Sequence, residues 1–105
     1  MKCLHIITPV KDSIDSTLET VKAIMESDIL VPFTYTVYND FSTEENTHRL
    51  EEAARQWNFR LVNLSDLTDH PSPNYLLVLQ TAQKEAIEAD AGLLIVESDV
   101  IVKKN

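Results

Sequence analysis

Carboxylate side chains follow directly after two of the apolar runs in this sequence, where the ends of buried strands would place them. Glu97, Ser98 and Asp99 follow the run LLIV, and Asn39 and Asp40 end the β-branched and aromatic run FTYTVY. Two carboxylates that flank one residue at a rigid strand end can direct oxygen ligands at Mg²⁺ or Mn²⁺. An aspartate at such a position can also accept a hydrogen bond from a ligand.

Each of these groups also has a purely structural interpretation. Asn39 and Asp40 are residue types that form turns and cap helices. Ser42 lies three residues before Glu45, which is the spacing of a capping box at the start of a helix. The Glu-Ser-Asp segment fits a solvated strand end. The choice between these interpretations depends on what else the fold brings to the same edge.

The elements that would position these residues alternate between strand and helix. Apolar or β-branched runs predict strands at 3–8, 33–39, 59–64 and 93–98, and apolar spacings of three and four predict helices at 13–27, 44–57 and 75–89. Pro9 is expected to end the first strand, and Gly92 to lie near the end of the last helix. We therefore expect an α/β fold, a Rossmann-like and mainly parallel sheet of about four strands with helices on both faces.

The carboxyl ends of parallel strands meet at one edge of a sheet, and open α/β sheets bind ligands there. This edge would collect Thr8, Pro9, Val10, Lys11 and Asp12 after the first strand, Asn39 and Asp40 after the second, Asp66, Asp69 and His70 in the loop after the third, and Glu97 and Asp99 after the fourth. Such a convergence of polar groups is typical of a metal site or a polar-ligand site.

Composition narrows the classes of function. The chain has 105 residues, which we interpret as a single domain over 1–105, with 17 acidic and 9 basic residues and a net charge of −8. This charge argues against nucleic acid or an anionic membrane surface as a partner. The single glycine leaves no GxGxxG or P-loop motif. One cysteine and no apolar run long enough to span a membrane predict a cytoplasmic location.

Three segments in order, HIITPVKD, TVYNDFSTEEN and LLIVESDV, resemble the nucleotide-sugar-binding half of family 2 glycosyltransferases, which share the GT-A fold. In that family the first strand ends in a turn with Thr or Pro, the second in Asp-Asp followed by a small residue and Ser, and the fourth in an Asp-x-Asp-type metal motif. The matching segments here are Thr8-Pro9, Asn39-Asp40-Phe41-Ser42 and Glu97-Ser98-Asp99. The resemblance covers essentially the whole chain.

The resemblance implies a nucleotide site on the first two strands. Thr8, with Pro9 and Val10 behind it, would line the pocket for the base. Asp40, next to Asn39, would accept a hydrogen bond from the uracil N3–H of a UDP-sugar.

The resemblance also implies a metal site on the fourth strand. Asp99 would bind the divalent cation, Mn²⁺ or Mg²⁺, that bridges the diphosphate. Glu97 would lie near the ribose or the metal.

The sequence departs from the family pattern in several places. Asn39 replaces the first Asp, Phe41 replaces a usual Gly, Val10 stands where an aromatic often stacks on the base, and Glu97 is longer than the usual Asp. An inverting transfer also needs a general base, which the family's acceptor-binding half supplies and which we do not find here. We therefore expect a donor-binding module, a fragment or half of a larger enzyme, without useful turnover and with an unknown acceptor.

Two other functions remain open. A non-catalytic interaction domain would retain the fold without the chemistry, which is consistent with Asn39 and Phe41. A receiver-type phosphoacceptor domain would need an acidic pair after the first strand, where Asp12 stands alone. We also expect that an exposed sheet edge could let the chain pair with itself.

Overall fold

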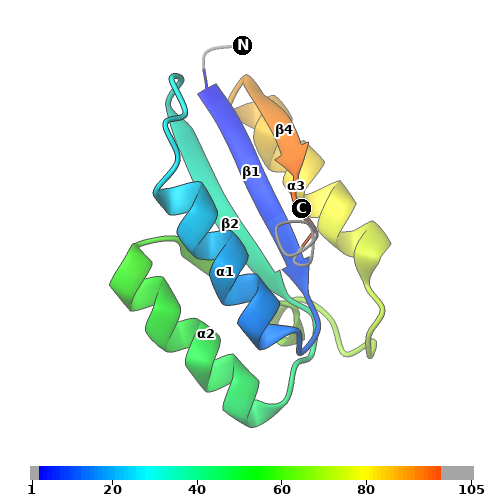
Figure 1. Cartoon of the computed structure of the whole chain (residues 1–105). Helices are drawn as coiled ribbons and strands as arrows, with labels where there is room; N and C mark the ends of the chain where they lie inside the picture. Colours follow the sequence, from blue (N-terminus) through cyan, green and yellow to red (C-terminus); the bar gives the residue numbers. More distant parts are fainter. Residues whose placement is uncertain (1–2, 98–105) are drawn as a thin grey trace.

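A computed structural model describes residues 3–97, which form a four-stranded sheet and three α-helices (Figure 1). In chain order the elements are β1 (Cys3–Val10), α1 (Ile14–Met25), β2 (Phe33–Asn39), α2 (Glu44–Trp57), β3 (Arg60–Asn63), the short 3₁₀ helix η1 (Leu64–Asp66), α3 (Tyr75–Glu88) and β4 (Ala91–Ile95). All three strand pairings are parallel, and the order is β3-β2-β1-β4. The predicted Rossmann-like architecture is therefore confirmed.

Helices cover both faces of the sheet. Successive side chains of a strand point to opposite faces, so Ile6 packs in one core cluster and Ile7 in the other. The Ile6 cluster includes Val21 of α1 and Leu50 of α2, whereas the Ile7 cluster includes Val78 of α3. Figure 1 shows α1 and α2 on one side of the sheet and α3 on the other.

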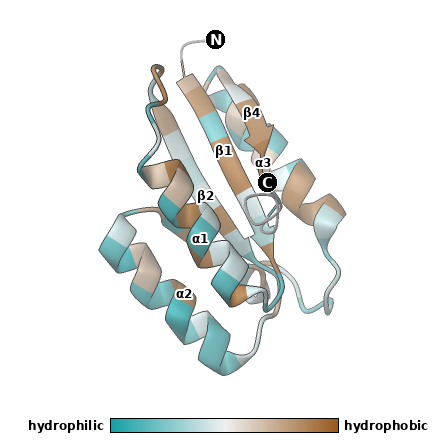
Figure 2. Ribbon diagram, in the orientation of Figure 1, coloured by the Kyte–Doolittle hydropathy of each residue, from teal (hydrophilic) through white to brown (hydrophobic). Residues whose placement is uncertain are grey.

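The helices are amphipathic in the way that this layered arrangement requires. Figure 2 shows that the visible outer side of α2 is mostly hydrophilic, whereas β4 is mostly apolar.

The two longest helices, α2 and α3, each have 14 residues. Within residues 3–97, no helix combines the length and the apolar character needed to cross a membrane.

β1 continues through Pro9, where the sequence predicted its end. The Ile7 carbonyl faces β4, because it accepts a hydrogen bond of 2.9 Å from the Val96 N–H. Pro9 lies two residues further on and faces the same side, but β4 pairs with β1 only as far as Ile7. The missing N–H of Pro9 therefore leaves no ladder hydrogen bond unmade, and the strand continues to pair with β2 up to Val10.

The bounds predicted for the second and third helices agree with α2 and, to within one residue, with α3, but two residues expected at their ends have other roles. Thr43, not Ser42, caps α2, because Thr43 Oγ1 accepts a hydrogen bond of 3.2 Å from the Asn46 N–H. Ser42 Oγ accepts one from the Asp12 N–H instead, at 2.8 Å. Gly92 lies inside β4 opposite Leu4, and α3 ends at Glu88 with Ala89 as its C-cap.

The direction of strand addition reverses between β1 and β4. The chain adds β2 and β3 on one side of β1 and then returns to place β4 on the other side. Open α/β sheets bind ligands at such a switch point, outside the carboxyl ends of the strands. Receiver-type domains have the order 2-1-3-4-5, so this sheet does not fit the receiver alternative.

Candidate functional site

Asp40, directly after β2, is buried and accepts three hydrogen bonds from the loop before α3. Its side chain is one of the few charged groups in the interior, with the residue 8% exposed. Oδ2 accepts hydrogen bonds from the Ser72 hydroxyl at 3.0 Å and the Asn74 N–H at 2.8 Å. Oδ1 accepts one from the Asn74 side-chain amide at 2.9 Å. Because a buried carboxylate is unfavourable without such donors, Asp40 holds the 67–74 loop against the end of β2.

Asn39 links the same strand end to α2 and β3. Its Nδ2 donates to Thr47 Oγ1 at 2.9 Å and to Asn63 Oδ1 at 2.8 Å. Its Oδ1 accepts from the Ser42 N–H at 3.1 Å. Both amide protons are therefore used, and one lone pair of Oδ1 is left for another partner.

Asp12 joins the turn after β1 to the turn after β2. Its Oδ1 accepts from the Thr43 N–H at 2.7 Å and from the Asn46 amide at 3.1 Å, and its Oδ2 accepts from Lys11 Nζ at 3.0 Å. The Thr43 N–H, followed by Lys11 and Asn46, lowers the pKa of Asp12 to about 2. Lys11 Nζ also donates to the Phe41 carbonyl at 2.9 Å. The Lys11 ammonium thus lies at the edge of the sheet, half-exposed.

The predicted base-pocket residues of β1 do not all point outward. Thr8 and Val10 lie under α1 and α2, with 0% and 3% of each residue exposed. Thr8 Oγ1 accepts a hydrogen bond of 2.8 Å from the Tyr35 hydroxyl. Pro9 is half-buried. The side chains of Thr8 and Val10 therefore pack in the interior beneath the carboxyl edge of the sheet. A contact between a nucleotide and Thr8, Pro9 or Val10 stays a prediction.

The predicted metal site is described only in part. Glu97 is exposed and lies two residues beyond the end of β4. β4 pairs with β1 at the switch point of the sheet. Ser98 and Asp99 lie outside the described residues. Within residues 3–97, no three His, Cys, Asp or Glu side chains are grouped so that they could hold a metal ion. The metal prediction therefore depends on Asp99 together with Glu97.

The loop after β3 contributes a different residue from those expected. Asp66, Asp69 and His70 are exposed, and the His70 carbonyl accepts a hydrogen bond of 2.9 Å from the Asn74 side chain. Asn74, which is buried, is the residue of this loop that reaches Asp40. In the sequence, Asn74 of the segment SPN resembles the Asn that precedes the third helix in family 2 glycosyltransferases.

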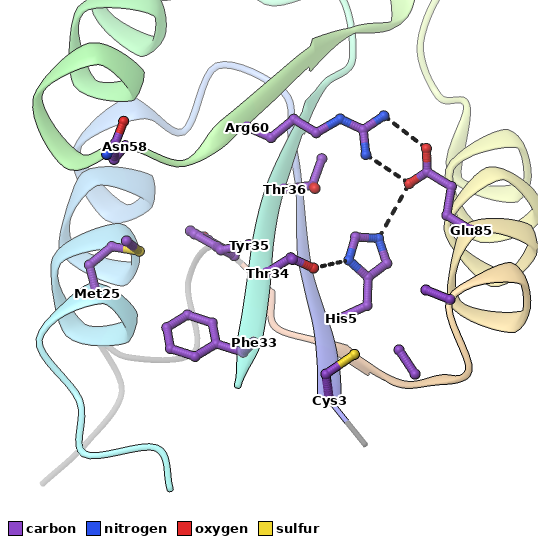
Figure 3. A pocket seen from close by; sticks show the side chains of 12 residues that line it. Cys3, His5, Met25, Phe33, Thr34, Tyr35, Thr36, Asn58, Arg60 and Glu85 are labelled. Carbon is purple, nitrogen blue, oxygen red and sulfur yellow. Dashed lines mark hydrogen bonds and ion pairs between the residues drawn. The ribbon is translucent and has the colours of Figure 1, made fainter. Parts of the chain in front are cut away.

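A second polar cluster occupies the amino-terminal half of the sheet, and the sequence patterns did not predict it (Figure 3). Glu85 of α3 accepts two hydrogen bonds from Arg60 of β3, at 2.9 and 2.8 Å, and one from the Tyr38 hydroxyl at 3.4 Å. His5 Nε2 lies 3.4 Å from Glu85, and His5 Nδ1 lies 2.8 Å from Thr34 Oγ1. Burial lowers the pKa of His5 from its ordinary value, although Glu85 opposes this shift. His5 is therefore neutral at pH 7.

Three solved structures of S. aureus TarS share the fold of this chain. TM-scores are 0.59 for one TarS structure, 0.58 for TarS 1-349 and 0.59 for TarS 1-349 in complex with UDP-GlcNAc, with 22%, 20% and 23% sequence identity. Each comparison covers 94% of this chain but only 17%, 28% and 27% of the TarS chains. No protein-family model and no curated protein sequence matches. At this identity the likeness concerns the fold, and it confirms the predicted GT-A architecture.

Replacing Asp40 by alanine tests whether its carboxylate holds the loop before α3. The change leaves the Ser72 hydroxyl and two Asn74 donors without their acceptor. Because hydrogen bonds to a charged group contribute about 1.5–3 kcal/mol, we expect the free energy of unfolding to fall by about 2–4 kcal/mol. Denaturant unfolding followed by circular dichroism measures this. Asp69→Ala, in the exposed part of the same loop, should change it by about 0.5 kcal/mol or less, and equal effects would contradict the role of Asp40.

Asp12→Ala tests the contact between the two turns through its pH dependence. The pKa of Asp12 is about 2 in the folded protein against an ordinary 3.8, so its stabilising effect is complete above the ordinary value and is lost as the pH falls toward 2. We expect the melting temperatures of wild type and variant to differ more at about pH 6 than at about pH 2.5. A difference that stays constant over this range would show that Thr43 and Asn46 do not hold the carboxylate. Asp28→Ala, in the exposed loop after α1, is the control.

Proposed function

We propose that this chain is the nucleotide-sugar-binding module of a family 2-like glycosyltransferase and takes a UDP-sugar together with a divalent cation. The observation that carries the proposal is the likeness over 94% of the chain to TarS, which was solved in complex with UDP-GlcNAc. TarS is a glycosyltransferase of the GT-A fold. The switch point between β1 and β4 supports the same conclusion, because ligands of open α/β sheets bind at that position.

In this proposal the base lies at the carboxyl ends of β1 and β2. A carboxylate has about four lone-pair positions, and the protein's own donors use three of those on Asp40. The fourth would accept the uracil N3–H. Lys11, half-exposed at the same edge, would approach the diphosphate.

The proposed cation, Mn²⁺ or Mg²⁺, would be held by Glu97 and Asp99. When bound, such an ion neutralises negative charge on the diphosphate. A protein with a net charge of −8 and exposed carboxylates at this edge would otherwise repel an anionic donor. The described residues support this part of the proposal through the exposed Glu97 at the switch point.

Sugar transfer itself is proposed for a longer protein that contains this module. The chain spans 28% or less of the TarS chains that it resembles, and the acceptor, the donor sugar and the general base are not assigned to residues here. A cytoplasmic location and self-association through a sheet edge stay predictions. The second candidate function is a non-catalytic interaction domain, which the internal hydrogen bonds of Asn39 and Asp40 favour.

The test is thermal unfolding of the chain with millimolar UDP, in Mn²⁺ and in EDTA. A ligand at 100 times its Kd should raise the free energy of unfolding by about 2.7 kcal/mol. For a domain of this size, that corresponds to a rise in Tm of roughly 10 °C. We expect the rise in Mn²⁺ but not in EDTA.

Asp99→Ala should abolish the rise in Mn²⁺, whereas Glu88→Ala, on the exposed side of α3, should retain it. If no nucleotide shifts the Tm of a folded sample, the glycosyltransferase proposal fails and the interaction-domain proposal takes its place.

A further inference from the structure

A cleft of about 490 Å³ opens beside the second polar cluster, in the amino-terminal half of the sheet (Figure 3). It exists because β3 pairs with β2 only from Thr36 onward, while α3 packs mainly on β4 and β1. Polar side chains from four elements line one part of it, namely His5, Thr34, Thr36, Arg60 and Glu85. Met25 and Phe33 supply apolar surface on the other side of β2.

Two buried polar atoms in this cleft lack a hydrogen-bond partner. Thr36 is 1% exposed, and no group among residues 3–97 forms a hydrogen bond with its Oγ1. His5 Nε2 lies 3.4 Å from Glu85 Oε1, but the geometry is not that of a hydrogen bond. A buried polar group without a partner is unfavourable. Two such atoms beside one cleft are therefore available to a polar molecule that binds there.

The charges in the cleft select a neutral ligand. The Arg60 guanidinium and the Glu85 carboxylate form two parallel hydrogen bonds, at 2.9 and 2.8 Å. An anion in the cleft would meet Glu85, and a cation would meet Arg60. The guanidinium has five N–H donors, so three remain, and the carboxylate keeps an unused lone pair. A hydroxyl group both donates and accepts, so it can bond to either partner without separating the pair.

We propose that this cleft binds a small neutral molecule with adjacent hydroxyl groups, such as a sugar ring or a polyol, through Thr36, His5 and the Arg60–Glu85 pair. The cleft lies toward the opposite ends of the strands from the carboxyl edge, so this proposal does not depend on the proposed donor site.

An NMR titration of the ¹⁵N-labelled chain tests the proposal. Glucose is the neutral probe, acetate the anionic probe and methylammonium the cationic probe, all at the same millimolar concentrations. We expect glucose to shift the amide signals of Thr34, Thr36 and Arg60 in a saturable way, and to leave those of Asp12 and Asp40 unchanged. The proposal is overturned if glucose gives no saturable shift in the cleft, or if a charged probe gives larger shifts than glucose.

Thr36→Val removes the unpartnered hydroxyl and keeps the shape of the side chain. We expect it to weaken glucose binding about tenfold and to leave Tm unchanged or higher, because an unpaired buried hydroxyl is lost. Thr17→Val is the matched control, since the buried Thr17 hydroxyl donates to the Ser13 carbonyl at 2.6 Å. It should lower Tm and retain glucose binding.

Thr36→Ser keeps the hydroxyl and should therefore keep glucose binding. This second variant tests the role of the hydroxyl even if Thr36→Val does not fold. Glucose binding by Thr36→Val that equals the wild type, or loss of binding in a folded Thr36→Ser, would contradict the assignment.

Discussion

The carboxyl edge of this sheet depends on satisfying one buried carboxylate. Asp40 directly follows β2, which is covered on both faces, and its burial is tolerable because Ser72 and Asn74 supply three hydrogen bonds. These donors come from the loop before α3, which therefore lies against the end of β2. Tyr75, the first residue of α3, follows Asn74 directly, and the helix then delivers the chain to β4 on the other side of β1. The hydrogen bonds of Asp40 thus hold the start of α3 against the end of β2.

Two further contacts make the same edge continuous. Asp12 holds the turn after β1 to the start of α2 through Thr43 and Asn46. Asn39 holds the end of β2 to α2 and to β3. Three loops are therefore fixed relative to one another before any ligand arrives, which reduces the ordering that a ligand would otherwise have to impose. This is the physical basis for proposing the edge as the donor site.

The strands and helices could be predicted from the sequence because their signals are local. Uninterrupted apolar runs marked the buried strands, and apolar spacings of three and four marked the helices. The predicted cap of α2 and the predicted end of β1 were wrong because each depends on residues that are distant in the sequence. Ser42 has the position of a helix cap, but it bonds to Asp12, 30 residues away. Pro9 was expected to end the first strand because it has no N–H to donate. Whether a neighbouring strand needs that N–H depends on the tertiary structure, and β4 pairs with β1 only as far as Ile7.

The contacts within the two polar sites could not be predicted from the sequence, because they also join residues that are distant along the chain. The contact between Asp40 and Asn74 joins residues 34 positions apart and has no local pattern. His5 and Arg60 lie in two separate strands and Glu85 lies in a helix, and nothing in their spacing along the sequence connects them. Only the packing of α3 beside β1 makes them a cluster.

The most direct test of the donor site is a map of where UDP binds. In an NMR titration of the ¹⁵N-labelled chain with UDP and Mg²⁺, we predict saturable shifts at residues 8–12 and 39–41 and no change at Thr36 and Arg60. Shifts confined to the amino-terminal half of the sheet, or no saturable shift in a folded sample, would contradict a nucleotide-sugar site at the carboxyl edge.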